Sequence, residues 1–142
     1  ALLWFGQVPV SGSYVADLLG PMLVAAVGLG LAFVPVTIAA VSNVSEDESG
    51  LASGLINTSQ QIGGALGLAV LGTIASSRTT DLISAAQGAP AAVPGALTEG
   101  FQLAFMTGAG FAVLGIVATL VLIRREDSQA IVGASPAELP MA

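Results

Sequence analysis

The sequence contains no cysteine, no histidine and no lysine, and each absence removes a class of function. Without cysteine the chain forms neither disulfide bonds nor thiolate metal sites. Without histidine it lacks the side chain that most often serves as a metal ligand or as a general base. Charged residues make up only 8% of the chain, whereas a typical soluble domain has about 25%. Such a chain has too little charged surface to remain in water as a globule.

Hydrophobic residues, in contrast, make up 54% of the sequence, and the mean hydropathy is +0.90. The few charges are segregated, which leaves long uncharged spans at 1–16, 18–45, 49–77 and 100–123. A helix of about 20 apolar residues crosses a bilayer, so the pattern predicts an all-α membrane protein. The net charge of −6 argues against a nucleic-acid partner.

The uncharged spans predict three complete transmembrane helices and the tail of a fourth. Loop-forming residues and charges separate them, and a weak helix over 79–86 is possible inside the second loop. The predicted organisation is the end of a transmembrane helix at 1–8, transmembrane helices at 18–42, 50–77 and 101–123, a loop at 78–99 and a disordered tail at 124–142.

The arginines predict how these helices are oriented. Arg124 and Arg125 are the only basic pair and follow the last span directly. Because basic residues favour the cytoplasmic side, the C-terminus is expected to be cytoplasmic. Counting back through the spans, the loop 78–99 is then extracytoplasmic.

The span 18–42 carries small residues and one interior proline. Gly28 and Gly30 permit close approach of a neighbouring helix. Pro35 lies well inside the apolar run, so we expect it to kink the helix and free the carbonyl of Leu31. A neighbouring helix or the hydroxyl of Thr37 would then satisfy that carbonyl.

The span 50–77 is apolar overall but contains the polar run from Asn57 to Gln61. Carboxamides facing lipid are costly, so Asn57, Gln60 and Gln61 are expected to face a cavity or another helix. They are candidates to line a substrate path. Hydrogen bonding between helices, without any ligand, is the alternative, and the sequence leaves both interpretations open.

Glycines flank this polar run at helical spacing. Gly50 with Gly54, and Gly63 with Gly67, each form a G-x-x-x-G pattern, which lets two helices approach closely. Together with Gly64 they are predicted helix-packing positions. The same spacing also arises by chance in glycine-rich membrane helices.

No ionisable residue lies within the three predicted complete spans. Proton coupling through a membrane needs a titratable group at depth, so coupling carboxylates would have to lie outside this chain. The sequence also offers no nucleophile–base pair, no metal-ligand cluster and no phosphate-binding loop. We therefore expect no enzyme activity, no metal site and no cofactor.

The segment Gly50–Gly67, GLASGLINTSQQIGGALG, carries a family resemblance. It resembles the penultimate helix of EmrB/QacA-like drug:proton antiporters, a branch of the major facilitator superfamily with fourteen transmembrane helices. The run Gly28–Pro35 resembles the preceding helix, and Gly100–Phe105 resembles the start of the last one. The resemblance covers about residues 15–123. Many members carry arginine where this chain has Gln60, so a charge at this position is not carried over, although hydrogen bonding is.

The resemblance implies the C-terminal fragment of a multi-pass secondary transporter in the cell membrane. Such a protein would carry out proton-coupled efflux of small amphipathic compounds or drugs, as in antibiotic resistance. Its partners would be the lipid bilayer, the remaining helices of the same transporter, the substrate and protons. A structural or accessory membrane protein that associates through its glycine-rich faces is the alternative. A small four-helix exporter is a third hypothesis, but it would need a carboxylate within the membrane.

The polar run leads to a testable prediction for the full-length protein. Cysteine placed at Asn57 or Gln61 should react with aqueous thiol reagents, because these positions are predicted to face a water-lined interior. Cysteine at Leu68 or Val70, farther along the span and outside the polar run, is the control and should react far less. Equal inaccessibility of all four positions would refute a water-lined path.

Overall fold

A computed structural model describes residues 1–41 and 44–122, and these residues are helical with short connections. In this part of the chain there is no β-strand, which confirms the all-α prediction. The elements are α1 (Leu2–Phe5), the π-helix η1 (Tyr14–Leu18), α2 (Leu19–Val41), the 3-10 helix η2 (Glu46–Glu48), α3 (Ser49–Ala85), the 3-10 helix η3 (Pro90–Ala92) and α4 (Val93–Leu122).

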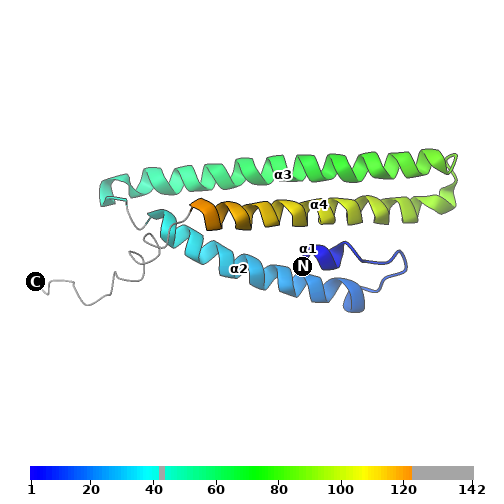
Figure 1. Cartoon of the computed structure of the whole chain (residues 1–142), viewed down its shortest axis with the longest axis horizontal. Coiled ribbons are helices and arrows are strands. Elements are labelled where there is room, and N and C mark those ends of the chain that lie inside the picture. Colours follow the sequence, from blue (N-terminus) through cyan, green and yellow to red (C-terminus); the bar gives the residue numbers. More distant parts are fainter. Residues whose placement is uncertain (42–43, 123–142) are drawn as a thin grey trace, which may run out of the picture.

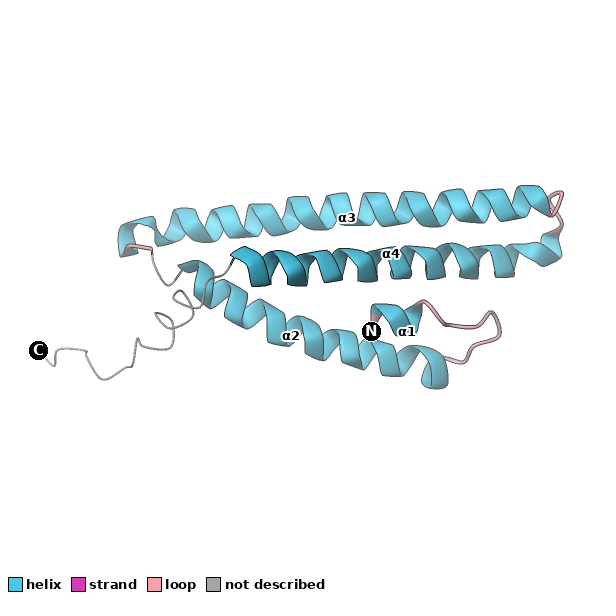
Figure 2. Cartoon of the chain, in the orientation of Figure 1, coloured by secondary structure: helices cyan, strands magenta, loops and turns pink. Residues whose placement is uncertain are grey.

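The long helices α3 and α4 form an antiparallel hairpin that organises the rest (Figure 1). The short helix α1 packs against both α4 and α2, and the C-terminal end of α2 meets the beginning of α3. Figure 2 shows that α1 lies in the wedge between α2 and α4. Within the described residues, α2 and α4 scarcely touch each other.

The hairpin is held where the backbones of α3 and α4 approach each other closely. The Thr79 hydroxyl donates to the carbonyl of Ala75 at 2.8 Å on its own helix, and it also lies 3.2 Å from the Ala96 carbonyl on α4. Ala75 and Ala96 are buried. A Cβ on Gly100 would lie 2.5 Å from the Ala75 carbonyl and would overlap the Thr79 hydroxyl. Only glycine fits there, so this contact sets the spacing of α3 and α4.

An exposed ion pair lies beside this contact. Arg78 on α3 and Glu99 on α4 approach to 3.1 Å, with both side chains about half exposed to solvent. Because water screens such a pair, it contributes only about 0–1 kcal/mol. The pair therefore helps to set the register of the hairpin more than its stability.

Helix α1 packs against α4 through aromatic and polar contacts. The rings of Phe5 and Phe105 stack with centroids 5.0 Å apart. The amide of Gln102 donates to the carbonyl of Val8 at 2.9 Å, a bond that joins residues far apart in sequence. On the other side, a Cβ on Gly20 would lie 2.8 Å from the indole of Trp4, so α2 also approaches this end of the chain closely.

The start of the second helical segment is capped by its own sequence. The Ser13 hydroxyl accepts from the backbone N–H of Ala16 at 3.3 Å, and the Ser13 N–H donates to the Asp17 carboxylate at 2.8 Å. This reciprocal pattern satisfies backbone groups that a helix start leaves free. The helix therefore begins at Tyr14, slightly before the predicted start at residue 18.

The predicted loop at 78–99 is wrong in its secondary structure. Helix α3 continues to Ala85, and helical structure resumes at Pro90. Residues 78–86 contain neither glycine nor proline, so the charge at Arg78 does not interrupt the helix. The end is set by a Schellman motif, in which Gly88 N–H donates to the Ile83 carbonyl at 2.9 Å and Gln87 adopts a positive φ of 53°. The possible helix over 79–86 is thus part of α3, and the extracytoplasmic position of this turn stays a prediction.

Pro35 lies inside a helix that continues on both sides of it. The hydroxyl of Thr37 donates to the carbonyl of Phe33 at 2.8 Å. Of the two partners expected for the Leu31 carbonyl, Thr37 is therefore wrong, because its hydroxyl bonds to the carbonyl four residues before it. A neighbouring helix as the partner stays a prediction. The kink at Pro35 stays a prediction.

Two helical segments in the described chain, Tyr14–Ile38 and Pro90–Val121, are long and apolar enough to cross a membrane. Their large side chains are mostly uncovered: Leu31 is 72% exposed and Leu120 is 76% exposed. Apolar area left in water costs about 25 cal/mol per Å², so these faces suit lipid or further helices. Helix α3 is not among the two segments, and its membrane span at 50–77 stays a prediction. The predicted tail 124–142 lies outside the described residues.

The contact at Gly100 gives a stability prediction. Gly100→Val should destabilise the hairpin by about 1–3 kcal/mol, because its side chain would collide with backbone and with Thr79. Thermal unfolding of the purified full-length protein in detergent measures this. Gly95→Ala is the matched control: it lies on the same helix, its Cβ would meet nothing within 4 Å, and it should stabilise slightly. Equal unfolding temperatures for the two variants would show that the close contact is absent.

Candidate functional site

A small polar recess lies where α2 meets α3. It has a volume of about 180 Å³ and is lined by Thr37 of α2 and by Ser53, Ile56, Asn57 and Gln60 of α3. Residues 53, 57 and 60 follow the i, i+4, i+7 spacing that places side chains along one face of a helix. The recess therefore groups two carboxamides and two hydroxyl groups in a chain that is otherwise mostly apolar.

The carboxamides of this recess are available for binding. Asn57 and Gln60 are exposed, and neither has a hydrogen-bond partner among the residues that the structure describes. Each carboxamide offers two N–H donors and an acceptor oxygen. In a membrane such groups need water, a ligand or another helix, because lipid satisfies none of them. This unmet capacity is the main chemical feature of the site.

The hydroxyl groups differ in how they are used. Thr37 donates its proton to the Phe33 carbonyl, so only its lone pairs face the recess. The neighbouring Thr58 likewise donates to the Gly54 carbonyl at 2.8 Å and does not line the recess. Only Ser53 adds a hydroxyl with no partner among the described residues. The lining is thus polar and uncharged.

The structure separates the three predicted path residues. Asn57 and Gln60 share the recess, whereas Gln61 is exposed on α3 and does not line it. Ser53 lies on the same helical face as Asn57 and Gln60 and joins them in the recess, whereas the sequence suggests a role for Thr37 only beside the proline kink. The sequence did contain a signal for Thr37 as a recess residue: a polar hydroxyl two residues after Pro35 in an otherwise apolar span.

The predicted packing glycines have no close neighbour within the described chain. A Cβ added at any of them would meet nothing within 4 Å; these are Gly28, Gly30, Gly50, Gly54, Gly63, Gly64 and Gly67. Gly63 and Gly67 border a separate apolar groove with Leu2 of α1 and Gly108 of α4. Their role in packing therefore stays a prediction that concerns partners beyond these helices. The close glycine contacts within the chain are at Gly6, Gly12, Gly20 and Gly100.

Chemically, the recess can bind but cannot take up protons. Carboxamides and hydroxyl groups form hydrogen bonds with polar atoms of a neutral or charged guest, yet they do not titrate near neutral pH. Within the described residues there is also no group of acidic side chains that fits a metal ion. The arrangement fits recognition better than catalysis.

These features define the class of protein: an all-α membrane protein whose helices expose apolar faces around a small uncharged polar recess. Comparison with known proteins narrows the class. The chain is 31% identical over 110 residues to puromycin resistance protein pur8 of Streptomyces alboniger. The match covers 78% of this chain and 22% of that protein.

Two further relatives are shorter matches. Cephamycin export protein CmcT of Amycolatopsis lactamdurans is 39% identical over 77 residues, 54% of this chain and 16% of that protein. An uncharacterized MFS-type transporter, EfpA of Mycobacterium tuberculosis, is 38% identical over 66 residues, 46% of this chain and 12% of that protein. These relatives are named for resistance, export and transport rather than for catalysis. They support membership of this chain in the major facilitator superfamily (MFS).

The chain spans about a fifth or less of the length of the curated relatives it matches. No protein-family model and no solved structure matches it. The relatives therefore support transport and efflux in general.

Proposed function

We propose that this chain is the C-terminal part of a proton-coupled exporter of small amphipathic compounds, including drugs. The observation that carries the proposal is the match over 78% of the chain to a puromycin resistance protein, together with the matches to an export protein and an MFS-type transporter. The exposed apolar faces of α2 and α4 support a place in the membrane.

In this proposal the recess contributes to the substrate path. Asn57 and Gln60 offer hydrogen bonds to polar atoms of the substrate, and the apolar side chain of Ile56 contacts its hydrophobic part. A volume of about 180 Å³ is small compared with the roughly 300–1,000 Å³ of a typical ligand pocket. The recess would therefore form one wall of a larger cavity that helices of the remaining transporter complete. Gln61 would act on a different face of α3.

Proton coupling is assigned to the remainder of the transporter. The recess holds only uncharged groups. The charged residues of the described helices lie near helix ends, at Asp17, Glu46, Asp47, Glu48, Arg78, Asp81 and Glu99. Transport by alternating access also needs two halves that move against each other. This chain would thus shape the path and not drive it.

The finer assignment follows the sequence resemblance. We place the chain in the EmrB/QacA-like branch with fourteen transmembrane helices, as a multi-pass protein of the cell membrane with a cytoplasmic C-terminus. Its partners are the bilayer, the other helices of the transporter, the exported compound and protons. Gln60 in place of the branch's frequent arginine would favour hydrogen bonding over charge pairing with the substrate.

The alternative is a structural or accessory membrane protein that associates through its glycine-rich faces. The open surroundings of Gly28, Gly50 and Gly63 are compatible with such contacts. This hypothesis predicts no substrate movement by the full-length protein, so a transport assay separates it from the exporter.

An accumulation assay tests the exporter. Cells that lack their own efflux pumps and express the full-length protein should retain less of a fluorescent amphipathic dye than cells with an empty vector. A protonophore should abolish the difference if the proton gradient drives export. Equal retention with and without the protein, across a panel of amphipathic dyes, would contradict export. Export that survives collapse of the proton gradient would contradict proton coupling alone.

Substitutions in the recess test its role. Asn57→Leu and Gln60→Leu should each lower export by roughly threefold to tenfold, because each removes one neutral hydrogen bond to the substrate. The measurement is the initial rate of dye efflux, normalised to the amount of protein in the membrane. Thr58→Val is the matched control: it removes a hydroxyl on the same helix that already bonds to Gly54 and does not line the recess. If Thr58→Val lowers export as much as Gln60→Leu, the recess has no special part.

A further inference from the structure

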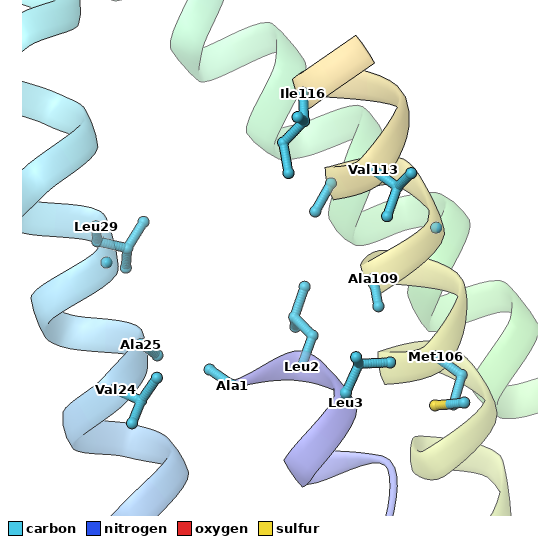
Figure 3. A pocket seen from close by; sticks show the side chains of 13 residues that line it. Ala1, Leu2, Leu3, Val24, Ala25, Leu29, Met106, Ala109, Val113 and Ile116 are labelled. Carbon is cyan, nitrogen blue, oxygen red and sulfur yellow. The ribbon is translucent and has the colours of Figure 1, made fainter.

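Two hollows that α2 lines differ sharply in polarity. A groove of about 720 Å³ between α2 and α4 contains no polar side chain in its lining, and Figure 3 shows Leu29 of α2 facing Val113 and Ile116 of α4 across it. The recess of about 180 Å³ between α2 and α3 carries two carboxamides and two hydroxyl groups instead. Of the two hollows, only the recess offers side-chain hydrogen bonds to the polar end of a compound.

The side chains of the recess offer hydrogen bonds in both directions. Asn57 and Gln60 each carry two N–H donors and an acceptor oxygen. Thr37 offers acceptor lone pairs only, because its proton is donated to the carbonyl of Phe33 at 2.8 Å. Ser53 adds a hydroxyl that both donates and accepts. A guest group that donates and accepts satisfies this lining, whereas a group of one kind leaves part of it unpaired.

The two carboxamides are spaced to bind one planar amide. Residues three apart on a helix lie on one face with Cβ atoms about 5–6 Å apart, so Asn57 and Gln60 reach the same guest from neighbouring turns. One of them donates an N–H to the carbonyl oxygen of a guest amide, while the other accepts the N–H of that amide. A guest amide is therefore complementary to this pair.

The recess has no charge that matches an ionic group. Its polar side chains are all neutral, and a charge moved out of water without a partner is costly. The acidic residue closest to it along α3 is Glu48, nine residues before Asn57, or about 13 Å along the helix axis. Glu48 is exposed and accepts from the Ser45 hydroxyl at 3.1 Å. Salt screens exposed charges beyond about 8 Å, so Glu48 adds little for a cation between the carboxamides.

We propose that the recess binds an uncharged carboxamide or lactam group of the exported compound and selects it over an ammonium or a carboxylate group. The apolar body of the compound contacts Ile56 and extends out of the recess, because about 180 Å³ holds a polar end group and not a whole drug-sized molecule. The proposal rests on the proposed function in treating the recess as part of the substrate path. It adds the chemical class of the group that enters.

Binding of matched compounds to the full-length protein in lipid nanodiscs tests this selection. Four compounds share one naphthylalkyl body and end in a primary carboxamide, a methyl ester, an ammonium or a carboxylate. Their affinities are measured by calorimetry, and titrations into empty nanodiscs are subtracted to remove partitioning into lipid. The carboxamide should bind about tenfold more tightly than each of the others, because it alone both donates and accepts hydrogen bonds and carries no charge.

A carboxylate placed in the recess should reverse the selection. Gln60→Glu keeps the size of the side chain, removes its two N–H donors and adds a negative charge at about pH 8. The ammonium compound should then gain about tenfold in affinity, while the carboxamide compound binds severalfold more weakly. Asn57→Asp repeats the measurement at the second carboxamide.

Thr58→Glu is the matched control for the added charge. Thr58 lies on the same helix between the two carboxamides, but it does not line the recess. The variant should therefore keep the preference for the carboxamide compound. If Thr58→Glu favours the ammonium compound as strongly as Gln60→Glu does, the effect belongs to charge in general and the proposal is overturned.

The outcomes separate this proposal from the proposed function. If the protein without substitutions binds the ammonium or the ester compound as tightly as the carboxamide, or binds none of the four, the selection is overturned. Tight binding of the carboxamide without export of any compound contradicts the exporter and supports the selection. Export of amphipathic dyes without a preference for the carboxamide contradicts the selection alone.

Discussion

The close approach of α3 and α4 is the constraint on which the other helices depend. Where the two helices approach most closely, Gly100 faces Ala75, and the Thr79 hydroxyl bonds to the carbonyls of Ala75 and Ala96. The two backbones therefore come together without large side chains between them. Helix α1 packs on the α4 side of this hairpin through Phe105 and Gln102, and α2 in turn packs on α1. In a membrane, where water provides no hydrophobic drive between helices, such small-residue contacts are the main source of packing energy.

Most of the apolar surface outside this contact has no partner in the described chain. Leu51 and Leu68, on the helix with the polar recess, are 78% and 76% exposed. Such a surface is expected for helices that meet lipid and further helices, and it agrees with relatives several times longer than this chain. The recess fits the same picture, because its carboxamides have donors and acceptors that these helices leave unused. Both the apolar and the polar surface therefore point to neighbours that complete them.

Element ends show where sequence reasoning succeeded and where it failed. The helical type of each long segment followed from uncharged apolar runs, and the capped start near Ser13 lies close to its predicted place. The sequence prediction misplaces the end of α3, because it treats the charge at Arg78 as a helix boundary. A charged residue ends a membrane span but not a helix, and this helix continues until Gln87 and Gly88 form its αL turn. The αL residues Gln87 and Gly88, not the charge at Arg78, set the end of α3.

The sequence by itself determined the class of the protein: composition and charge segregation require helices in an apolar environment, and the polar run requires a face turned away from lipid. It also determined which side chains have chemistry to offer, namely Asn57, Gln60 and Gln61. Only the tertiary structure decided that Asn57 and Gln60 line one recess with Thr37 of α2 while Gln61 does not. It also decided that Gly100, and not the G-x-x-x-G glycines, makes the close contact. The physical reason is that helical spacing places residues on a face, whereas the rotation of one helix against another selects the face that is used.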